Sequence, residues 1–192
     1  MHISPSSWLK FGLFTVGLGQ SFVFVLVPPL ARDLGLSEIQ TSSIFAISAL
    51  AWATTSAFWG RTSDKYGRRN IAILGLVGYS ISLIALITPL FLAQKNLLNV
   101  TLLFPALVLG RLINGLVGSA TRPASFAYIA DITSKDNRTV KFARLESSFL
   151  LGTVAGPLVG GFLFLISNET PFYVFSGLAS VSYTHLTLPT IL

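Results

Sequence analysis

The sequence predicts an all-α polytopic membrane protein. Of its 192 residues, 52% are hydrophobic and only 10% are charged, whereas a soluble domain carries about a quarter of its residues as charges. Long uncharged runs alternate with short segments that hold most of the basic residues. These runs are too long for the strands of an outer-membrane barrel and lack their alternation. Since a bilayer provides no water for backbone polar groups, we expect each run to be a helix.

Six helices are expected along the chain. Crossing a hydrocarbon core of about 30 Å takes roughly 20 apolar residues. Four uncharged runs meet that length, a fifth is interrupted by Arg111 and Arg122, and a sixth begins near Pro171. The first run ends at Pro28-Pro29 and is longer than the apolar part of a signal peptide, which favours a retained helix over a cleaved leader. The expected helices cover approximately residues 8–30, 40–60, 71–93, 101–130, 145–167 and 171–180 onward.

Basic residues are distributed unequally between the connections. The segments Arg61–Arg69 and Lys135–Arg144 hold four Lys or Arg each, whereas two other connections hold one each, Arg32 and Lys95. Because basic loops stay on the cytoplasmic side, we expect a cytoplasmic N-terminus. The net charge of +6 lies in these short connections and not on a broad exposed face, so nucleic acid is not an expected partner.

The end of the chain differs from the rest. The run from Val181 to Thr190 resembles the translation of a transposon-type sequencing adapter. We therefore expect a single transmembrane bundle over residues 1–180, a sixth helix truncated near Ser180, and a non-native tail over residues 181–192. The alternative is a genuine, moderately apolar helix end, which hydropathy does not exclude.

A polar motif follows the second expected helix, with the sequence Gly60-Arg-Thr-Ser-Asp64-Lys-Tyr-Gly67-Arg68-Arg69. Gly67 can adopt a positive φ at low cost, and Asp64 can cap or face a helix N-terminus. Arg68 and Arg69 can hold the helix end at an anionic leaflet. A basic loop by itself is usually a topology determinant, but the order Gly, Asp, Gly-Arg-Arg is more specific.

The fourth expected helix carries two arginines within its apolar run. Arg111, Gly115, Gly118 and Arg122 recur at helical spacing and share one face. An arginine at this depth costs at least about 2.5 kcal/mol, so Arg111 should face a cavity or a polar partner. The glycines allow another backbone to approach closely. Asn114 can share the role of Arg111, and the alternative for Arg111 is a structural hydrogen-bond hub between helices.

Glycines at every fourth position mark the fifth expected helix. Gly152, Gly156 and Gly160 form a flat strip suited to helix packing. Pro157 removes a backbone hydrogen bond and bends the helix, and Gly161 completes a terminal Gly-Gly pair. The central Gly-Pro makes this pattern more specific than a simple repeat of small residues.

These three segments, in this order, resemble the major facilitator superfamily. The run Gly60–Arg69 is similar to the family's loop motif between helices two and three, Leu109–Gly115 to its arginine motif in helix four, and Gly152–Gly161 to its antiporter motif in helix five. The likeness covers about residues 8–180, and the drug:proton antiporter branch, with its tetracycline-type exporters, is the most similar. It implies the N-terminal six-helix bundle of a twelve-helix fold, in which two bundles rock around a midplane site.

The resemblance also implies a function and a set of roles. It implies proton-coupled export of a small amphipathic substrate across a bacterial inner membrane by alternating access, without a cofactor or metal and together with a missing C-terminal half. Asp64 would face a helix end of that half and Arg68 would pair with Asp131 in a cytoplasmic latch, while Gly156 and Pro157 would pack against the other bundle. The expected residues are Gly60, Asp64, Gly67, Arg68, Arg69 and Asp131 for the latch; Gln20, Phe24, Arg111 and Asn114 for the central cavity or proton coupling; and Gly115, Gly118, Gly152, Gly156, Pro157, Gly160 and Gly161 for helix packing.

Several alternatives stay open. No acidic residue lies in the middle of an apolar run, so proton coupling would use the absent half, Glu146 or Asp131, or coupling is not to protons. Ordinary packing is the alternative role for Gln20 and Phe24. A symporter for sugars or organic acids and a self-sufficient six-helix protein that dimerises are further interpretations. An enzyme is not expected, because His2 is the only histidine outside the suspect tail and no Walker-type loop is present.

Overall fold

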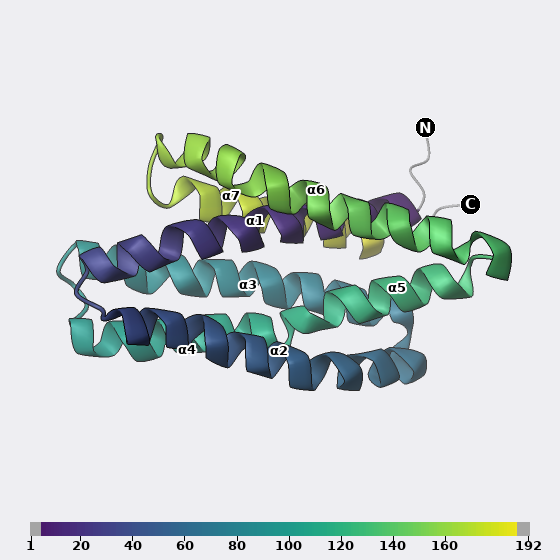
Figure 1. Ribbon diagram of the computed structural model, residues 1–192, viewed down its shortest axis with the longest axis horizontal. Coiled ribbons are helices and arrows are strands. Elements are labelled where there is room, and N and C mark those ends of the chain that lie inside the picture. The colour runs from purple at the N-terminus through teal and green to yellow at the C-terminus, as the bar shows by residue number, and fades with distance from the viewer. Residues whose placement is uncertain (1–4, 188–192) are drawn as a thin grey trace.

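The computed structural model describes residues 5–187 and forms an elongated bundle of antiparallel and parallel helices (Figure 1). No β-strand occurs in this described range, which confirms the all-α fold class. The N-terminal end of α1 and the C-terminal end of α7 lie at the same end of the bundle. The elements are α1 (Pro5–Asp33), α2 (Glu38–Tyr66), α3 (Arg68–Gln94), α4 (Val100–Leu116), the 3-10 turn η1 (Gly118–Ala120), α5 (Thr121–Asp131), the 3-10 turn η2 (Lys135–Asn137), α6 (Arg138–Phe164) and α7 (Thr170–Thr187).

Four segments are long and apolar enough to cross a membrane: Ser6–Asp33, Arg68–Gln94, Val100–Asp131 and Lys135–Phe164. The helix α2 has the same length as α1, 29 residues, or about 43 Å at the rise of an α-helix. It is less apolar because it carries many Ser and Thr side chains. The helix α7 is shorter and continues past Ser180 to Thr187; residues 188–192 of the expected tail lie outside the described part.

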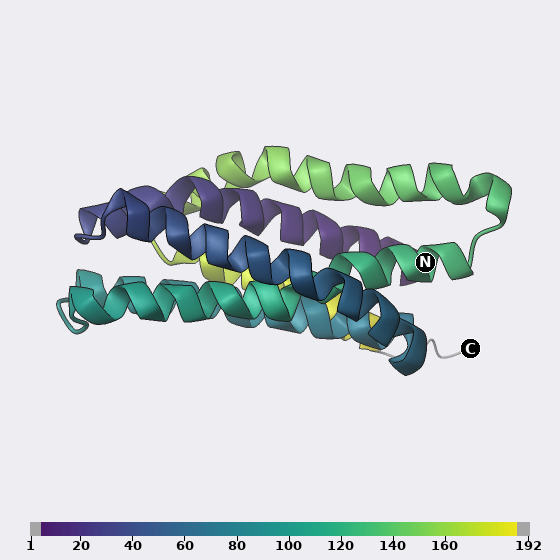
Figure 2. The same ribbon diagram turned by 60° about the horizontal axis from the view of Figure 1, so that its bottom comes forward.

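The helix α3 forms the centre of the bundle. It packs against α4, α5 and α7, and its inner face carries Leu76, Tyr79, Leu83 and Leu86, all nearly inaccessible to solvent. The most extensive helix pair is α1 with α6, which run side by side in the same direction in both views (Figures 1 and 2). The α2–α3 and α5–α6 connections lie at the end of the bundle that also holds both described chain ends. The two basic segments therefore share one end.

The second helix is longer than expected. It ends at Tyr66 and not near residue 60, so Arg61 and Lys65 belong to its last turns. Both are good helix formers, and the helix continues until Gly67. Gly67 has φ 94°, a conformation that favours glycine, and it is the one residue between α2 and α3. The expected loop is thus a single-residue turn.

The fourth expected helix is broken in the middle. Instead of one helix over residues 101–130, α4 ends at Leu116, η1 follows, and α5 starts at Thr121. Pro123 explains the break, because it lacks the N–H that would bond the carbonyl of Ser119 and its ring crowds that carbonyl. The fifth expected helix also begins earlier, at Arg138 and not at residue 145. The positions of these helix ends depend on single residues, and the average hydropathy of a segment does not predict them.

Candidate functional site

A polar cavity lies between α1, α2, α4 and α5. Its volume is about 190 Å³, and two of the predicted residues, Gln20 and Phe24, line it from α1. Arg111 and Asn114 line it from α4 and Arg122 from the start of α5. The structure therefore brings together all four residues expected at a central cavity. The α2 wall consists of Phe45, Ser48, Ala49 and Trp52.

Arg111 is the most deeply buried cation of this cavity. Its residue exposure is 3%, and its guanidinium carbon lies 5.6 Å from the centre of the Phe24 ring and 5.4 Å from that of Phe45. The two rings stack on each other with centroids 4.9 Å apart. Its Nε has no hydrogen-bond partner, and no carboxylate pairs with the side chain within the described residues. The aromatic faces offset part of the cost of burying this charge.

Close contact between α2 and α4 positions Arg111 and Asn114. The hydroxyl of Ser48 donates to the carbonyl of Arg111 at 2.8 Å, and that of Thr55 donates to the carbonyl of Gly115 at 2.9 Å. A Cβ on Gly115 would lie 2.6 Å from the carbonyl oxygen of Ser48, so a larger residue would separate the two helices. Gly115 thus acts in packing inside this bundle.

Gly118 has a different role from Gly115. A Cβ at this position would lie 2.5 Å from Oδ1 of Asn114, and Asn114 itself is only 6% exposed. Gly118 also begins the 3-10 turn that separates α4 from α5. It therefore leaves room for the buried amide at the point where the helix breaks.

Arg122 and Glu146 connect α5 to α6. Nη2 of Arg122 donates to both carboxylate oxygens of Glu146, at 2.6 and 2.5 Å. The same guanidinium lies over the ring of Phe149, 4.5 Å from its centre. Both charged side chains are about one-third exposed, 31% and 34%. Arg122 thus connects the cavity wall to a carboxylate of α6.

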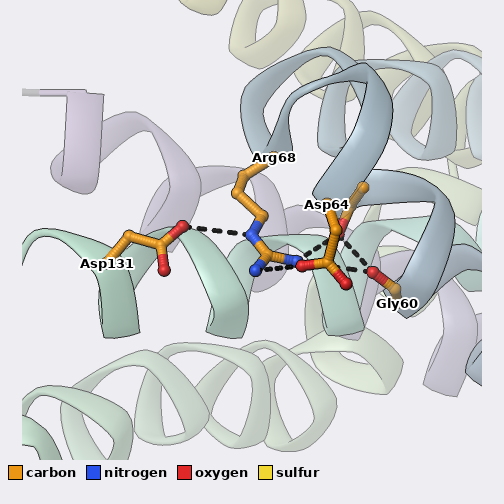
Figure 3. A network of polar contacts seen from close by, with 5 residues as sticks. Gly60, Asp64, Arg68 and Asp131 are labelled. Carbon is orange, nitrogen blue, oxygen red and sulfur yellow. Dashed lines mark hydrogen bonds and ion pairs between the residues drawn. The ribbon is translucent and has the colours of Figure 1, made fainter.

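Arg68 is the centre of the predicted latch (Figure 3). Its Nε donates to Oδ2 of Asp131 at 3.1 Å, and its guanidinium also forms an ion pair with Asp64. Nη1 donates to the hydroxyl of Ser63 at 2.9 Å and to the carbonyl of Gly60 at 3.4 Å. Arg69 follows it in the first turn of α3. One side chain thus holds the ends of α2 and α5 together.

The charges of this latch are weakly shielded. The side chains of Asp64 and Asp131 are 59% and 56% exposed, whereas that of Arg68 is 23% exposed. Exposed ion pairs contribute about 0–1 kcal/mol each. Such contacts can break and reform readily. In this structure Asp64 contacts Arg68 of its own bundle.

The glycines of α6 pack against α1 in this bundle; the expected contact of Gly156 with the other bundle stays a prediction. A Cβ on Gly152 would overlap the carbonyl oxygen of Phe14, and one on Gly156 would overlap that of Leu18. A Cβ on Gly160 would overlap the Phe22 ring, and Pro157 lies within this stretch of helix.

Gly161 lies outside the strip. A Cβ there would meet nothing within 4 Å, so Gly161 makes no close contact within the described bundle and its expected packing role stays a prediction. The reason is helical geometry: positions four apart share a face, whereas the next residue is rotated by about 100°.

The α2 wall of the cavity was missed by sequence reasoning. Its signal is the recurrence of Thr41, Ser48 and Thr55 at intervals of seven, which places small hydroxyl side chains along one stripe of the helix. Two of these hydroxyls bond carbonyls of α4, and the helix then presents Phe45 and Trp52 to the cavity. No group of three or more His, Cys, Asp or Glu suited to a metal occurs in the described part of the chain.

Comparisons with known proteins agree with this architecture. Residues 9–189 match the Major Facilitator Superfamily. The chain is 29% identical over 175 residues to the quinolone resistance protein NorA of Staphylococcus aureus, an alignment that covers 91% of this chain and 42% of that relative. It is 33% identical over 169 residues to the class B tetracycline resistance protein of Escherichia coli, covering 86% of this chain and 39% of the relative. The chain therefore spans about two fifths of the length of these relatives.

Proposed function

The chain belongs to the major facilitator superfamily, and on that premise we propose that it is one six-helix half of a secondary transporter that exports small amphipathic compounds by alternating access. Membership of this family and four apolar helices make it an integral membrane protein. The names of its relatives, which refer to quinolone and tetracycline resistance, support drug export as the activity. The remaining part of the transporter would be a second six-helix bundle.

The buried guanidinium in the cavity is the observation that carries this proposal. Arg111 is enclosed by Phe24 and Phe45 and faces a cavity with polar and aromatic walls. A charge at this depth is costly unless it faces a polar space or a partner, and such groups mark substrate or ion pathways. A flat amphipathic molecule would place its apolar surface on the rings and its polar atoms toward Arg111, Gln20 and Asn114. The cavity is thus our candidate for this bundle's share of the substrate site.

The orientation follows from the two basic segments. Both lie at the bundle end that also holds the described chain ends, and because basic segments tend to stay on the cytoplasmic side, we propose that this end faces the cytoplasm. We propose a bacterial inner membrane as the location. The Arg68 contacts with Asp64 and Asp131 would then form a cytoplasmic latch that favours the outward-open state and releases when the cavity opens inward.

The proton gradient is the proposed energy source. The test uses vesicles that contain the complete transporter, which are loaded with a pH-sensitive dye and given norfloxacin, tetracycline or ethidium as probes. We expect movement of at least one probe with protons moving the opposite way, and no movement in vesicles without the protein. Co-movement of probe and protons would support the symporter alternative, and no movement of any probe or proton would contradict drug transport.

A further inference from the structure

Within the described residues, the ion pair between Arg122 and Glu146 is the only one with a member, Arg122, in the wall of the central cavity. The seven Asp and Glu of the sequence all lie in the described range, and the cavity wall contains none of them. Glu146 is one hydrogen bond away from that wall, through Arg122. The other ion pairs join Arg32 to Glu38 or belong to the latch. Glu146 is thus the carboxylate with the most direct connection to the cavity.

The pair is not enclosed by this bundle. Both side chains are about one-third exposed, so a proton can reach the carboxylate without crossing the packed core of the described helices. Both Glu146 oxygens are bonded by a single nitrogen of Arg122, at 2.6 and 2.5 Å. Phe149 covers one face of the guanidinium at 4.5 Å. Protonation of Glu146 would remove the charge that holds Arg122, while the ring would keep the cation near the cavity.

Asp131 is less suited to this role than Glu146. It is 56% exposed and bonds Arg68 in the latch, at the bundle end and away from the cavity wall. Other charged or titratable groups on elements packed against α6 are also unbonded to Glu146: within the described residues, no ion pair or hydrogen bond joins it to any of them. These groups are Lys10, Arg32 and Asp33 of α1, Tyr128 and Asp131 of α5, Lys135 and Asp136 of η2, and Tyr173, Tyr183 and His185 of α7.

We propose that Glu146 binds the transported proton and that Arg122 transmits its charge state to the cavity. This inference rests on the proposed proton-coupled export. With Glu146 ionised, its charge offsets Arg122 and the cavity tolerates an apolar or cationic occupant. When Glu146 takes a proton from water, the carboxylate charge is lost, and Arg122 joins Arg111 as an uncompensated cation beside the occupant. Because unpaired charges in a low-dielectric site are strongly unfavourable, protonation expels that occupant.

The return step is the reverse. The O–H bond of protonated Glu146 breaks, the proton passes to water on the opposite side of the membrane, and the carboxylate accepts hydrogen bonds from Arg122 again. Proton and occupant thereby exclude each other, which is the requirement for antiport. A ligand can drive the exchange only through its different affinity for the two states.

The test compares two transport modes of the complete transporter in proteoliposomes, with whichever of norfloxacin, tetracycline or ethidium the wild type moves. One mode is exchange of labelled for unlabelled probe without a pH gradient, and the other is accumulation driven by a pH gradient. For Glu146→Gln we expect both modes to fall about tenfold or more, because the neutral amide resembles the protonated carboxyl and leaves Arg122 uncompensated beside the occupant. Asp136→Asn, an exposed acid of η2 at the same bundle end, should retain both modes, and Glu146→Asp should restore coupling.

Removing one member of a charge pair leaves the other unpaired, so Glu146→Gln can fold poorly. The double variant Arg122→Gln with Glu146→Gln removes both charges and should exchange probe without proton coupling. Gradient-driven accumulation at the wild-type level in either variant would overturn the inference while leaving export intact. A wild type that moves no probe would overturn the proposed export and this inference together. A wild type that exports without protons would overturn the proposed proton coupling and this inference but leave export intact.

Discussion

Adding one methyl group at Gly156 should weaken the α1–α6 interface by an amount that the structure allows us to work out. The new Cβ would overlap the carbonyl oxygen of Leu18 and Oγ of Ser21 and lie 3.0 Å from the Leu18 carbonyl carbon. The Ser21 hydroxyl is held by hydrogen bonds to the carbonyls of Gly17 and Leu18, at 3.0 and 3.2 Å. Neither obstacle is a flexible side-chain end, so the helices must separate. Overpacking of this kind costs about 1–3 kcal/mol.

Gly161→Ala is the matched control on the same helix. Both substitutions gain about 1 kcal/mol from the higher helix propensity of alanine, but a Cβ at Gly161 meets nothing within 4 Å. The difference between the two variants is therefore the overpacking cost alone. Gly156→Ala should therefore unfold below Gly161→Ala. Because the complete transporter is longer than this chain, the difference should be smaller than the roughly 2–4 °C per kcal/mol typical of 150–250 residues.

The measurement is the thermal unfolding midpoint of the complete transporter in detergent, followed by fluorescence-detected size-exclusion chromatography. Equal midpoints for the two variants would refute the assignment of Gly156 to the α1 interface. A loss of stability that disappears when the second bundle is removed would instead show that this glycine packs between bundles. Retained stability with lost transport would point to the same conclusion.

The remaining predictions concern the cavity and the latch. Arg111→Ala should abolish export of the probes while membrane insertion and yield stay normal; normal drug resistance in cells carrying it would remove Arg111 from the mechanism. Arg111→Lys keeps the charge but loses the flat guanidinium beside Phe24 and Phe45. The lost cation–π interaction is worth about 0.5–2 kcal/mol, so probe binding should weaken about 2- to 30-fold when it is measured by fluorescence quenching. Asp64→Asn removes one carboxylate from Arg68 and should slow turnover more than it weakens probe binding, with Glu38→Gln at the opposite bundle end as control; an unchanged turnover number would count against the latch.

Much of the architecture could be predicted because it depends on local physical properties. The free energy of transfer from water to the bilayer identifies which apolar runs form membrane helices. Gly67 ends α2 because a φ of 94° is a conformation that glycine adopts at low cost. The pairing of Arg68 with Asp131, expected from the family resemblance, is present at 3.1 Å. The cavity grouping of Gln20, Phe24, Arg111 and Asn114 also agrees with expectation, although their roles in transport stay predictions.

Other features could not be predicted because they depend on how each helix is rotated about its own axis. The repeat of Gly152, Gly156 and Gly160 predicts a packing strip but not the helix that packs on it. In the structure that helix is α1. The Ser48 hydroxyl turns the aromatic wall of α2 toward the cavity through its bond to the carbonyl of Arg111, a contact between residues far apart in the chain.

The amino-acid sequence by itself determined that this protein is a bundle of membrane helices with its basic residues in two connections, because solvation and backbone hydrogen bonding act on each segment independently. Only the tertiary structure decided that the fourth segment breaks at η1, that Arg122 meets Glu146 across two helices, and which glycines touch α1. Those outcomes depend on contacts between several helices. A buried charge is stable only when a neighbouring helix supplies an opposite charge or a polar group, and a glycine allows close packing only when another backbone lies against it.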